Sequence, residues 1–208
     1  MAKNKRRATL AHRCPRCRIN THWCFCEHIK TVESDVRVSI VMHHTERWLT
    51  SNTAHFASLV LPSCEIIERG VLDSPIPEDI FSCPDTDYLY LFPTEDSLPI
   101  REFAKTKKTV HLVVPDGSWS KAKKIHKREN IFKAMPKYHL IDVGTSNYQL
   151  RKSPGENFLC TYEAVANALE VLDNSVVKDQ MLEVFDVFVK RVLMSRKGVF
   201  DLDKQESL

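Results

Sequence analysis

The most constraining feature of this chain is an apolar stretch that ends in a polar turn. Residues 110–115 read VHLVVP and are followed at once by DGSW at residues 116–119, and a basic segment with helical character comes next. In open α/β sheets, ligands bind beyond the carboxyl ends of the strands. The pattern therefore predicts an α/β fold with a site at Asp116. Helix capping by Asp116 or Ser118, with Trp119 in the core, explains the same residues equally well.

Length and composition indicate a globular domain with room for a small appendage. Hydrophobic residues make up 43% of the 208 residues, and the longest apolar runs, such as residues 88–92, have the length of a strand. A membrane-spanning helix needs about 20 apolar residues. The basic segment at residues 3–7 is not followed by the apolar region of a secretory signal. We therefore expect a cytoplasmic protein with no membrane span and no obligate protein partner.

Positive charge is concentrated in two segments, although the net charge is only +3. One is the N-terminal arm. The other follows the DGSW turn and contains Lys121, Lys123, Lys124, Lys127 and Arg128. A basic patch on a nearly neutral protein is typical of binding to a polyanion such as nucleic acid. The alternative interpretation is an ordinary solvated helix face.

Four of the seven cysteines lie close together near the N-terminus, at Cys14, Cys17, Cys24 and Cys26. Two such pairs can place four thiolates around one tetrahedral Zn²⁺, and the metal then stabilises a segment too short to have its own core. Disulfides are the competing interpretation, but a reducing compartment disfavours them. The spacing predicts a zinc knuckle. Because four thiolates leave no open coordination position, the metal is expected to be structural.

The body of the chain contains further strand-like and helix-like segments. Strands are expected at residues 36–42, 66–67, 88–92, 110–114 and 138–143. Helices are expected at residues 54–61, with Asn52 as the cap, and at residues 161–172 and 178–194. More residues separate the strands than a hairpin needs, which favours crossover connections. We therefore expect a mostly parallel sheet flanked by helices.

Several motifs occur in the chain in a specific order. They are the Cys-x2-Cys-x6-Cys-x-Cys pattern, His43-x-x-Glu46 with Asn52-Thr53, Leu91-Phe92-Pro93, the DGSW turn, Tyr148-x-Leu-Arg151, and Leu159-Cys160-Thr161-Tyr162-Glu163-Ala164. With these motifs the chain, from Cys14 to about Leu169, resembles the DTW-domain family, the tRNA-uridine aminocarboxypropyltransferases. Ser118 stands where the family signature has Thr. The hydroxyl is kept, but the methyl group that restrains the rotamer is lost.

The resemblance implies a reaction and a fold. The reaction is transfer of the 3-amino-3-carboxypropyl group of S-adenosylmethionine to N3 of a uridine in tRNA, with release of methylthioadenosine. The fold is related to the knotted SPOUT methyltransferases, in which three loops form the cofactor pocket. Residues 1–33 would form the basic arm and the zinc knuckle, and residues 34–208 would form the catalytic domain.

The three loops that the resemblance implies, together with the chemistry of the reaction, predict the site residues. Asp116 is the expected base for the uridine N3 proton. Phe92, Trp119 and Leu159 would form an apolar wall. Arg151 would pair with the carboxylate of the migrating group, and Glu163 with its ammonium. The full set expected to bind the cofactor is Phe92, Pro93, Gly117, Ser118, Trp119, Arg151, Leu159, Thr161 and Glu163.

For RNA, basic side chains would bind phosphates in a salt-sensitive way. The expected contacts are Arg16, Lys121, Lys123, Lys124 and Lys127. The knuckle either grips a tRNA arm through Arg16, Arg18, His22 and Trp23 or is a purely structural clasp. Two other functions fit the sequence. One is a SPOUT-type RNA methyltransferase with the same cofactor, and the other is a zinc-containing RNA-binding module without catalysis.

Overall fold

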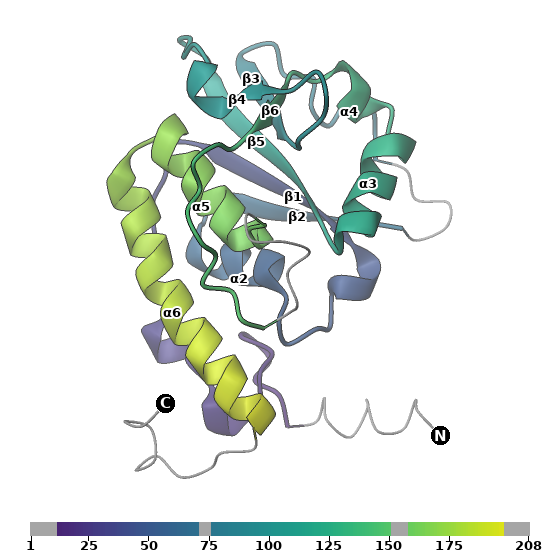
Figure 1. The fold of residues 1–208 in the computed structure, drawn as a ribbon. Coiled ribbons are helices and arrows are strands. Elements are labelled where there is room, and N and C mark those ends of the chain that lie inside the picture. The colour runs from purple at the N-terminus through teal and green to yellow at the C-terminus, as the bar shows by residue number, and fades with distance from the viewer. Residues whose placement is uncertain (1–11, 71–75, 151–157, 198–208) are drawn as a thin grey trace.

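One parallel sheet forms the centre of the computed structural model, which describes residues 12–70, 76–150 and 158–197 (Figure 1). Within these ranges the strands are β1 (Arg37–His43), β2 (Cys64–Arg69), β3 (Thr86–Leu91), β4 (Leu98–Pro99), β5 (Thr109–Asp116) and β6 (Lys137–His139). Their order in the sheet is β2-β1-β5-β3-β6-β4, and every pairing is parallel. The expectation of a mostly parallel α/β fold is confirmed.

Helices cover both faces of the sheet. The helices are α2 (Thr53–Val60), α3 (Trp119–Arg128), α4 (Ile131–Ala134), α5 (Thr161–Leu172) and α6 (Ser175–Lys197), with short 3₁₀ turns η1 (Thr21–Trp23), η2 (Cys26–His28), η3 (His44–Glu46) and η4 (Ile100–Glu102). Helices α2, α5 and α6 pack on one face, whereas α3 and α4 lie on the other (Figure 1). Within the described ranges, no helix combines the length and the apolar composition that a membrane crossing needs.

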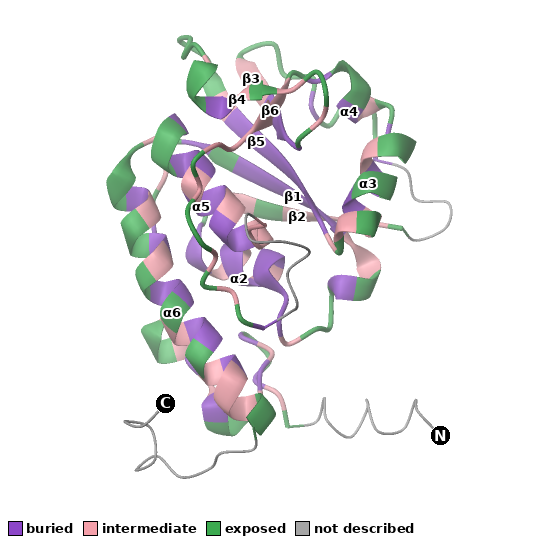
Figure 2. Ribbon diagram, in the orientation of Figure 1, coloured by how far each residue is buried: buried purple, intermediate pink, exposed green. Residues whose placement is uncertain are grey.

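The central strands are largely buried (Figure 2) because helices cover both faces of the sheet, and apolar side chains accordingly point to both sides. In β5, Leu112 and Val114 belong to the core under α5, whereas Val113 belongs to the core under α3. The side chains of β1 alternate in the same way, with Ile40 in the core under α5 and Val41 in the core under α3. This alternation fixes which way each residue at the end of β5 points.

The sequence predicted the strongly patterned elements well. Asn52 caps α2, since its side chain accepts a hydrogen bond from the amide of His55 (2.9 Å). Strand β6 is shorter than expected and ends at His139, and the chain reaches a left-handed conformation at Asp142 (φ 53°). The expectation of a strand through residue 143 is therefore wrong. Strand β4 and helix α4 are too short for a periodic signal and were not anticipated.

The cysteine-rich segment packs on the main core. Phe25 has no exposed surface, and its ring lies 5.6 Å from that of Phe56 on α2 and 5.7 Å from that of Phe188 on α6. Trp23 is also fully buried. Of the two alternatives for the knuckle, Trp23 fits the structural clasp, because its ring fills the interior near α6, where the Arg191 guanidinium lies 5.9 Å from it.

We predict that Phe56→Ala destabilises the protein by about 3–5 kcal/mol, because it leaves a cavity in the aromatic core. Phe56 stacks on Phe188 with ring centroids 4.5 Å apart and also on Tyr162 at 4.8 Å. Urea denaturation followed by circular dichroism measures the loss. Val176→Ala is the control, since Val176 is 58% exposed and its truncation is expected to change the unfolding free energy by less than about 0.5 kcal/mol. A Phe56→Ala protein as stable as the wild type would contradict this core assignment.

Candidate active site and metal centre

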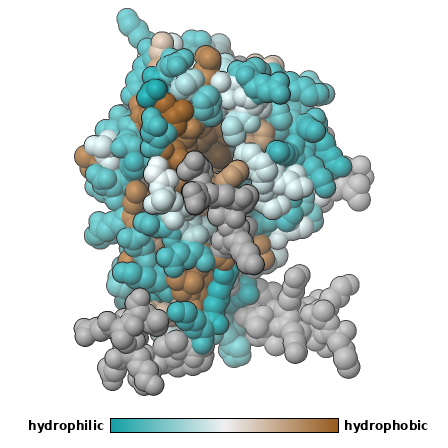
Figure 3. All heavy atoms as spheres, viewed as in Figure 1, coloured by the Kyte–Doolittle hydropathy of each residue, from teal (hydrophilic) through white to brown (hydrophobic). Residues whose placement is uncertain are grey.

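A cavity of about 330 Å³ lies at the carboxyl ends of β3, β5 and β6. This end of a parallel sheet is where α/β proteins bind ligands, and the volume falls within the range of about 300–1,000 Å³ that is usual for ligand pockets. Figure 3 shows an apolar hollow near the middle of the molecular face that carries α5 and the end of β5.

The cavity brings together six of the residues expected to bind a cofactor. They are Phe92, Pro93, Gly117, Trp119, Leu159 and Thr161. They come from three segments that are distant in sequence, after β3, after β5 and at the start of α5. The parallel strand order carries these segments to one edge of the sheet. The convergence is therefore a consequence of topology.

Aromatic rings dominate one wall of the cavity. The ring of Trp119 lies 5.5 Å from that of Phe92 and meets Phe158 edge to face at 5.4 Å. Aromatic faces stack on planar groups and attract cations. This wall suits a ligand that carries both an aromatic ring and a positive charge.

Asp116 lies directly behind the cavity wall. It is the last residue of β5, is only 6% exposed and, among the described residues, is not one that lines the cavity. Thr161 does line the cavity, and its Oγ1 donates a hydrogen bond to Asp116 Oδ1 (2.5 Å). The alternation of β5 turns Asp116 toward the core under α5. The expectation that the Asp116 carboxylate faces a ligand directly is therefore wrong, since the contact that links it to the cavity lining is the hydrogen bond from Thr161.

Glu163 has a different position from the expected one. Its buried carboxylate accepts hydrogen bonds from Ser146 Oγ (2.6 Å), the Asn147 amide (2.8 Å) and the Cys160 amide (2.9 Å). Three protein donors surround it, and it is not among the described residues that line the cavity. We therefore correct the expectation that Glu163 binds the ammonium of a ligand, since its carboxylate instead joins the loop before α5 to the helix.

Two other expected cofactor residues have different outcomes. Ser118 is exposed and occupies the N-cap of α3, but within the described part of the chain its side chain makes no capping hydrogen bond. It is also not among the described residues that line the cavity. Arg151 lies outside the described residues.

The turn between β5 and α3 requires a glycine at position 117. Its φ is 145°, and a Cβ at this position would lie 3.0 Å from Cβ of Lys121. The same added atom would lie 3.6 Å from Cβ of His43. The end of β1 therefore contacts the turn after β5. Burial lowers the pKa of His43, and the nearby side chains of His44 and Lys121 lower it further.

Lys121 is engaged within the protein. Its Nζ donates to Glu46 Oε1 (2.9 Å) and to Thr45 Oγ1 (2.7 Å), and Glu46 is only 3% exposed. An ammonium held by a buried carboxylate is poorly placed to bind an RNA phosphate. The other lysines expected to bind RNA are exposed on α3, namely Lys123, Lys124 and Lys127.

Sequence reasoning missed part of the cavity. His139, Leu140 and Val143 line it, as does Phe158. The first three fell within an expected strand, which would have carried them into the sheet. The turn-forming residue Gly144, which adopts a φ of 63°, was the available signal that the chain leaves the sheet here.

The four N-terminal cysteines form a compact cluster that could hold a metal ion. Their sulfur atoms all lie within 4.8 Å of one another. The Cys14 and Cys26 sulfurs are 3.6 Å apart, and those of Cys17 and Cys24 are 3.8 Å apart. Four thiolates around a tetrahedral ion with bonds of about 2.3 Å would be about 3.8 Å apart. A disulfide needs about 2.05 Å. The geometry fits a metal centre and excludes disulfides within the cluster.

The backbone of the first cysteine pair forms a compact turn. The Arg18 amide donates to the Cys14 carbonyl (2.9 Å), and the Cys14 amide donates to the Ile19 carbonyl (2.8 Å). Arg18 adopts a left-handed conformation with φ 63°. Burial raises the pKa of Cys17 to about 11, so metal binding would displace a proton from this thiol.

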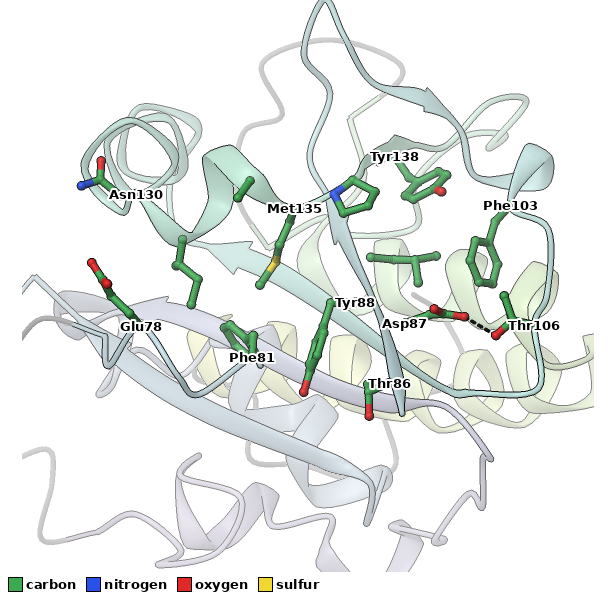
Figure 4. A pocket seen from close by; sticks show the side chains of 14 residues that line it. Glu78, Phe81, Thr86, Asp87, Tyr88, Phe103, Thr106, Asn130, Met135 and Tyr138 are labelled. Atoms are coloured by element: carbon green, nitrogen blue, oxygen red, sulfur yellow. Dashed lines mark hydrogen bonds between the residues drawn. The ribbon is translucent and has the colours of Figure 1, made fainter. Parts of the chain in front are cut away.

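A larger cavity of about 640 Å³ lies beside the first half of β3 (Figure 4). Phe81, Tyr88, Phe103 and Tyr138 line it, and its polar groups include Asp87, which accepts a hydrogen bond from Thr106 Oγ1 (2.5 Å). This cavity is away from the carboxyl ends of the strands. It contains none of the residues expected at the site.

Comparison with known proteins gives one family. Residues 11–193 match the family model described as the DTW domain. The chain is 28% identical over 180 residues to tRNA-uridine aminocarboxypropyltransferase 2 of Drosophila melanogaster, covering 78% of this chain and 67% of that protein. It is 25% identical over 177 residues to the protein of the same name in Mus musculus, covering 81% of this chain and 59% of that protein. The chain therefore spans about two thirds or less of these relatives. No solved structure matches.

We predict that the protein binds a single divalent ion through the cysteine cluster and that Cys17→Ser weakens Co²⁺ binding and reduces the thiolate absorption of the Co²⁺-loaded form. Chelation is expected to lower the melting temperature of the whole domain in one transition, because Ile19 and Phe25 of the knuckle belong to the main core. Absorption spectroscopy and calorimetry measure the two effects. Cys83→Ser is the control, since Cys83 is exposed and outside the cluster. A Cys17→Ser protein with an unchanged Co²⁺ spectrum would disprove the metal centre.

Proposed function

Because the chain belongs to the DTW-domain family, we propose that it transfers the 3-amino-3-carboxypropyl group of S-adenosylmethionine to N3 of a uridine in tRNA. The observation that carries this proposal is the cavity at the carboxyl ends of β3, β5 and β6, where three separate motif segments meet. The names of the Drosophila and mouse relatives support the same reaction.

S-adenosylmethionine combines a planar adenine with a sulfonium cation, and the aromatic wall suits both. Phe92 and Trp119 would contact the adenine or the sulfonium, and Leu159 would cover the opposite side. The sulfonium activates three carbon atoms. The enzyme therefore selects its product by geometry, burying the methyl group and turning the first carbon of the aminocarboxypropyl chain toward the nucleophile. Arg151 keeps its proposed role as the partner of the migrating carboxylate.

In the proposed reaction, a bond forms between uridine N3 and that carbon while the bond from the carbon to sulfur breaks. Sulfur leaves as the neutral thioether of methylthioadenosine. The N3 proton passes to the Thr161 hydroxyl, whose own proton moves to Asp116 along their hydrogen bond. Asp116 is therefore proposed as the final proton acceptor, acting through Thr161.

The basic side chains would bind RNA, and the cysteine cluster would stabilise the fold. We propose that the cysteine cluster holds Zn²⁺, since four thiolates in tetrahedral arrangement are typical of structural zinc. Arg16, Lys123, Lys124 and Lys127 would contact phosphates. Lys121 instead holds Glu46. Residues 1–33 would thus supply the arm and the metal-bound segment, and residues 34–208 the catalytic part.

The direct test incubates the purified, metal-loaded protein with unmodified tRNA and two forms of S-adenosylmethionine. One form is labelled in the aminocarboxypropyl chain and the other in the methyl group. We expect the first label to enter the RNA and mass spectrometry to find an aminocarboxypropyl uridine. Entry of the methyl label would identify a methyltransferase. Binding of tRNA without entry of either label would identify a non-catalytic RNA-binding module.

We predict that Asp116→Asn lowers kcat by about 10²–10⁴-fold, because the N3 proton loses its acceptor. Thr161→Val is expected to have a similar effect, since it removes the hydroxyl between Asp116 and the cavity. The KM for tRNA should change little in both variants. Asp179→Asn, an exposed carboxylate on α6, is the control and should retain wild-type kcat. Full activity of Asp116→Asn would disprove the base assignment.

A further inference from the structure

An exposed tryptophan lies between the cysteine-rich segment and the end of β1. Trp48 follows η3 and is 54% exposed. Tryptophan is usually well buried, and its large aromatic face is costly to leave in water. An exposed ring of this size therefore requires an explanation.

Arginines from two segments surround this ring. The guanidinium carbon of Arg47 lies 5.0 Å from the ring centre, and that of Arg18 lies 5.4 Å from it. Arg13 donates to the Trp48 carbonyl (2.8 Å), and Arg18 donates to the Arg47 carbonyl (2.9 Å). We call these four residues the arginine–tryptophan cluster. The hydrogen bonds to the backbone hold the ring in place.

The arginine–tryptophan cluster carries excess positive charge. Arg47 pairs with Glu68 at 3.3 Å. Within the described ranges, Arg13 and Arg18 form no ion pair. Each guanidinium donates a hydrogen bond to an uncharged backbone carbonyl. Each guanidinium has five N–H donors. The cluster thus combines an aromatic ring that is 54% exposed with N–H donors suited to an anion.

The cluster is connected to the candidate active site. Its loop continues from η3, where Thr45 and Glu46 hold Lys121 of α3. His43, the last residue of β1, lies beside Gly117, which lines the cavity. The arginine–tryptophan cluster and the cavity are therefore both linked to the segment that follows β1.

We infer that the arginine–tryptophan cluster binds an unpaired nucleotide of the RNA substrate, away from the nucleotide that reacts. The base stacks on Trp48, and the flanking phosphates pair with Arg13 and Arg18. Aromatic rings that stack on splayed bases, next to arginines that bind phosphate, are the usual means of holding single-stranded RNA. That the RNA is tRNA rests on the proposed function.

The test measures binding of an unmodified tRNA transcript to the full, metal-loaded chain by filter binding. Trp48→Ala is expected to raise the Kd for tRNA about 5- to 100-fold. Trp48→Phe keeps a smaller stacking face and should therefore raise this Kd by a smaller factor. The KM for S-adenosylmethionine should not change. Leu98→Ala is the matched control, because Leu98 is 53% exposed on β4 at the sheet edge. A fully paired duplex RNA should bind wild type and Trp48→Ala alike.

Arg13→Gln tests the phosphate contact separately. It should weaken tRNA binding and make the plot of log K against log salt less steep by about one unit. Unchanged tRNA binding by both Trp48→Ala and Trp48→Phe, in folded proteins, would overturn the inference. Equal weakening of duplex and tRNA binding by Trp48→Ala would overturn the stacking role.

The two proposals fail in different ways. If wild type transfers the aminocarboxypropyl group and Trp48→Ala binds tRNA normally, only the cluster inference is wrong. If wild type transfers nothing but its tRNA binding depends on Trp48, only the catalytic proposal is wrong. If Trp48→Ala does not fold, Trp48→Phe and Arg13→Gln decide the outcome.

Discussion

Parallel pairing of β5 between β1 and β3 is the constraint on which the site depends. It places Met42 opposite Asp116 and Tyr90 opposite Val113, so the carboxyl ends of all three strands meet at one edge of the sheet. Burial on both faces then fixes the direction of each side chain at that edge. The cavity is then lined by the segments that follow β3, β5 and β6, together with the start of α5.

The elements predicted correctly are those with a strong local pattern. Strand β5 is an apolar run ending at a turn, and α5 begins with a threonine and has helical periodicity, so local sequence determines both. Residues of the cavity could be named because motif positions fall at strand ends. The partners of individual side chains could not, since they depend on distant segments. Glu163 bonds to Ser146 and Asn147, and this contact exists only once the loop folds back on α5.

Two further differences between the sequence predictions and the structure arise from the alternation of side chains along a strand and from packing. A shift of one position along β5 would have turned Asp116 toward α3 and away from α5, and no local pattern reveals which face is covered by which helix. Trp23 lies in a segment that reads as an independent metal-binding unit, yet it is fully buried because the knuckle and α6 share a core. A metal ion bound by the cysteine cluster would therefore be thermodynamically linked to folding of the main core.

Arg18 illustrates how this chain couples the two parts. A non-glycine residue with φ 63° carries a backbone penalty of about 1 kcal/mol. Glycine would avoid the penalty, but it would also delete the guanidinium that reaches a carbonyl 29 residues away and lies over an aromatic ring. The chain thus keeps an unfavourable backbone conformation at one position of the cysteine-rich segment. In return, the Arg18 side chain joins the cysteine-rich segment to the segment that follows β1.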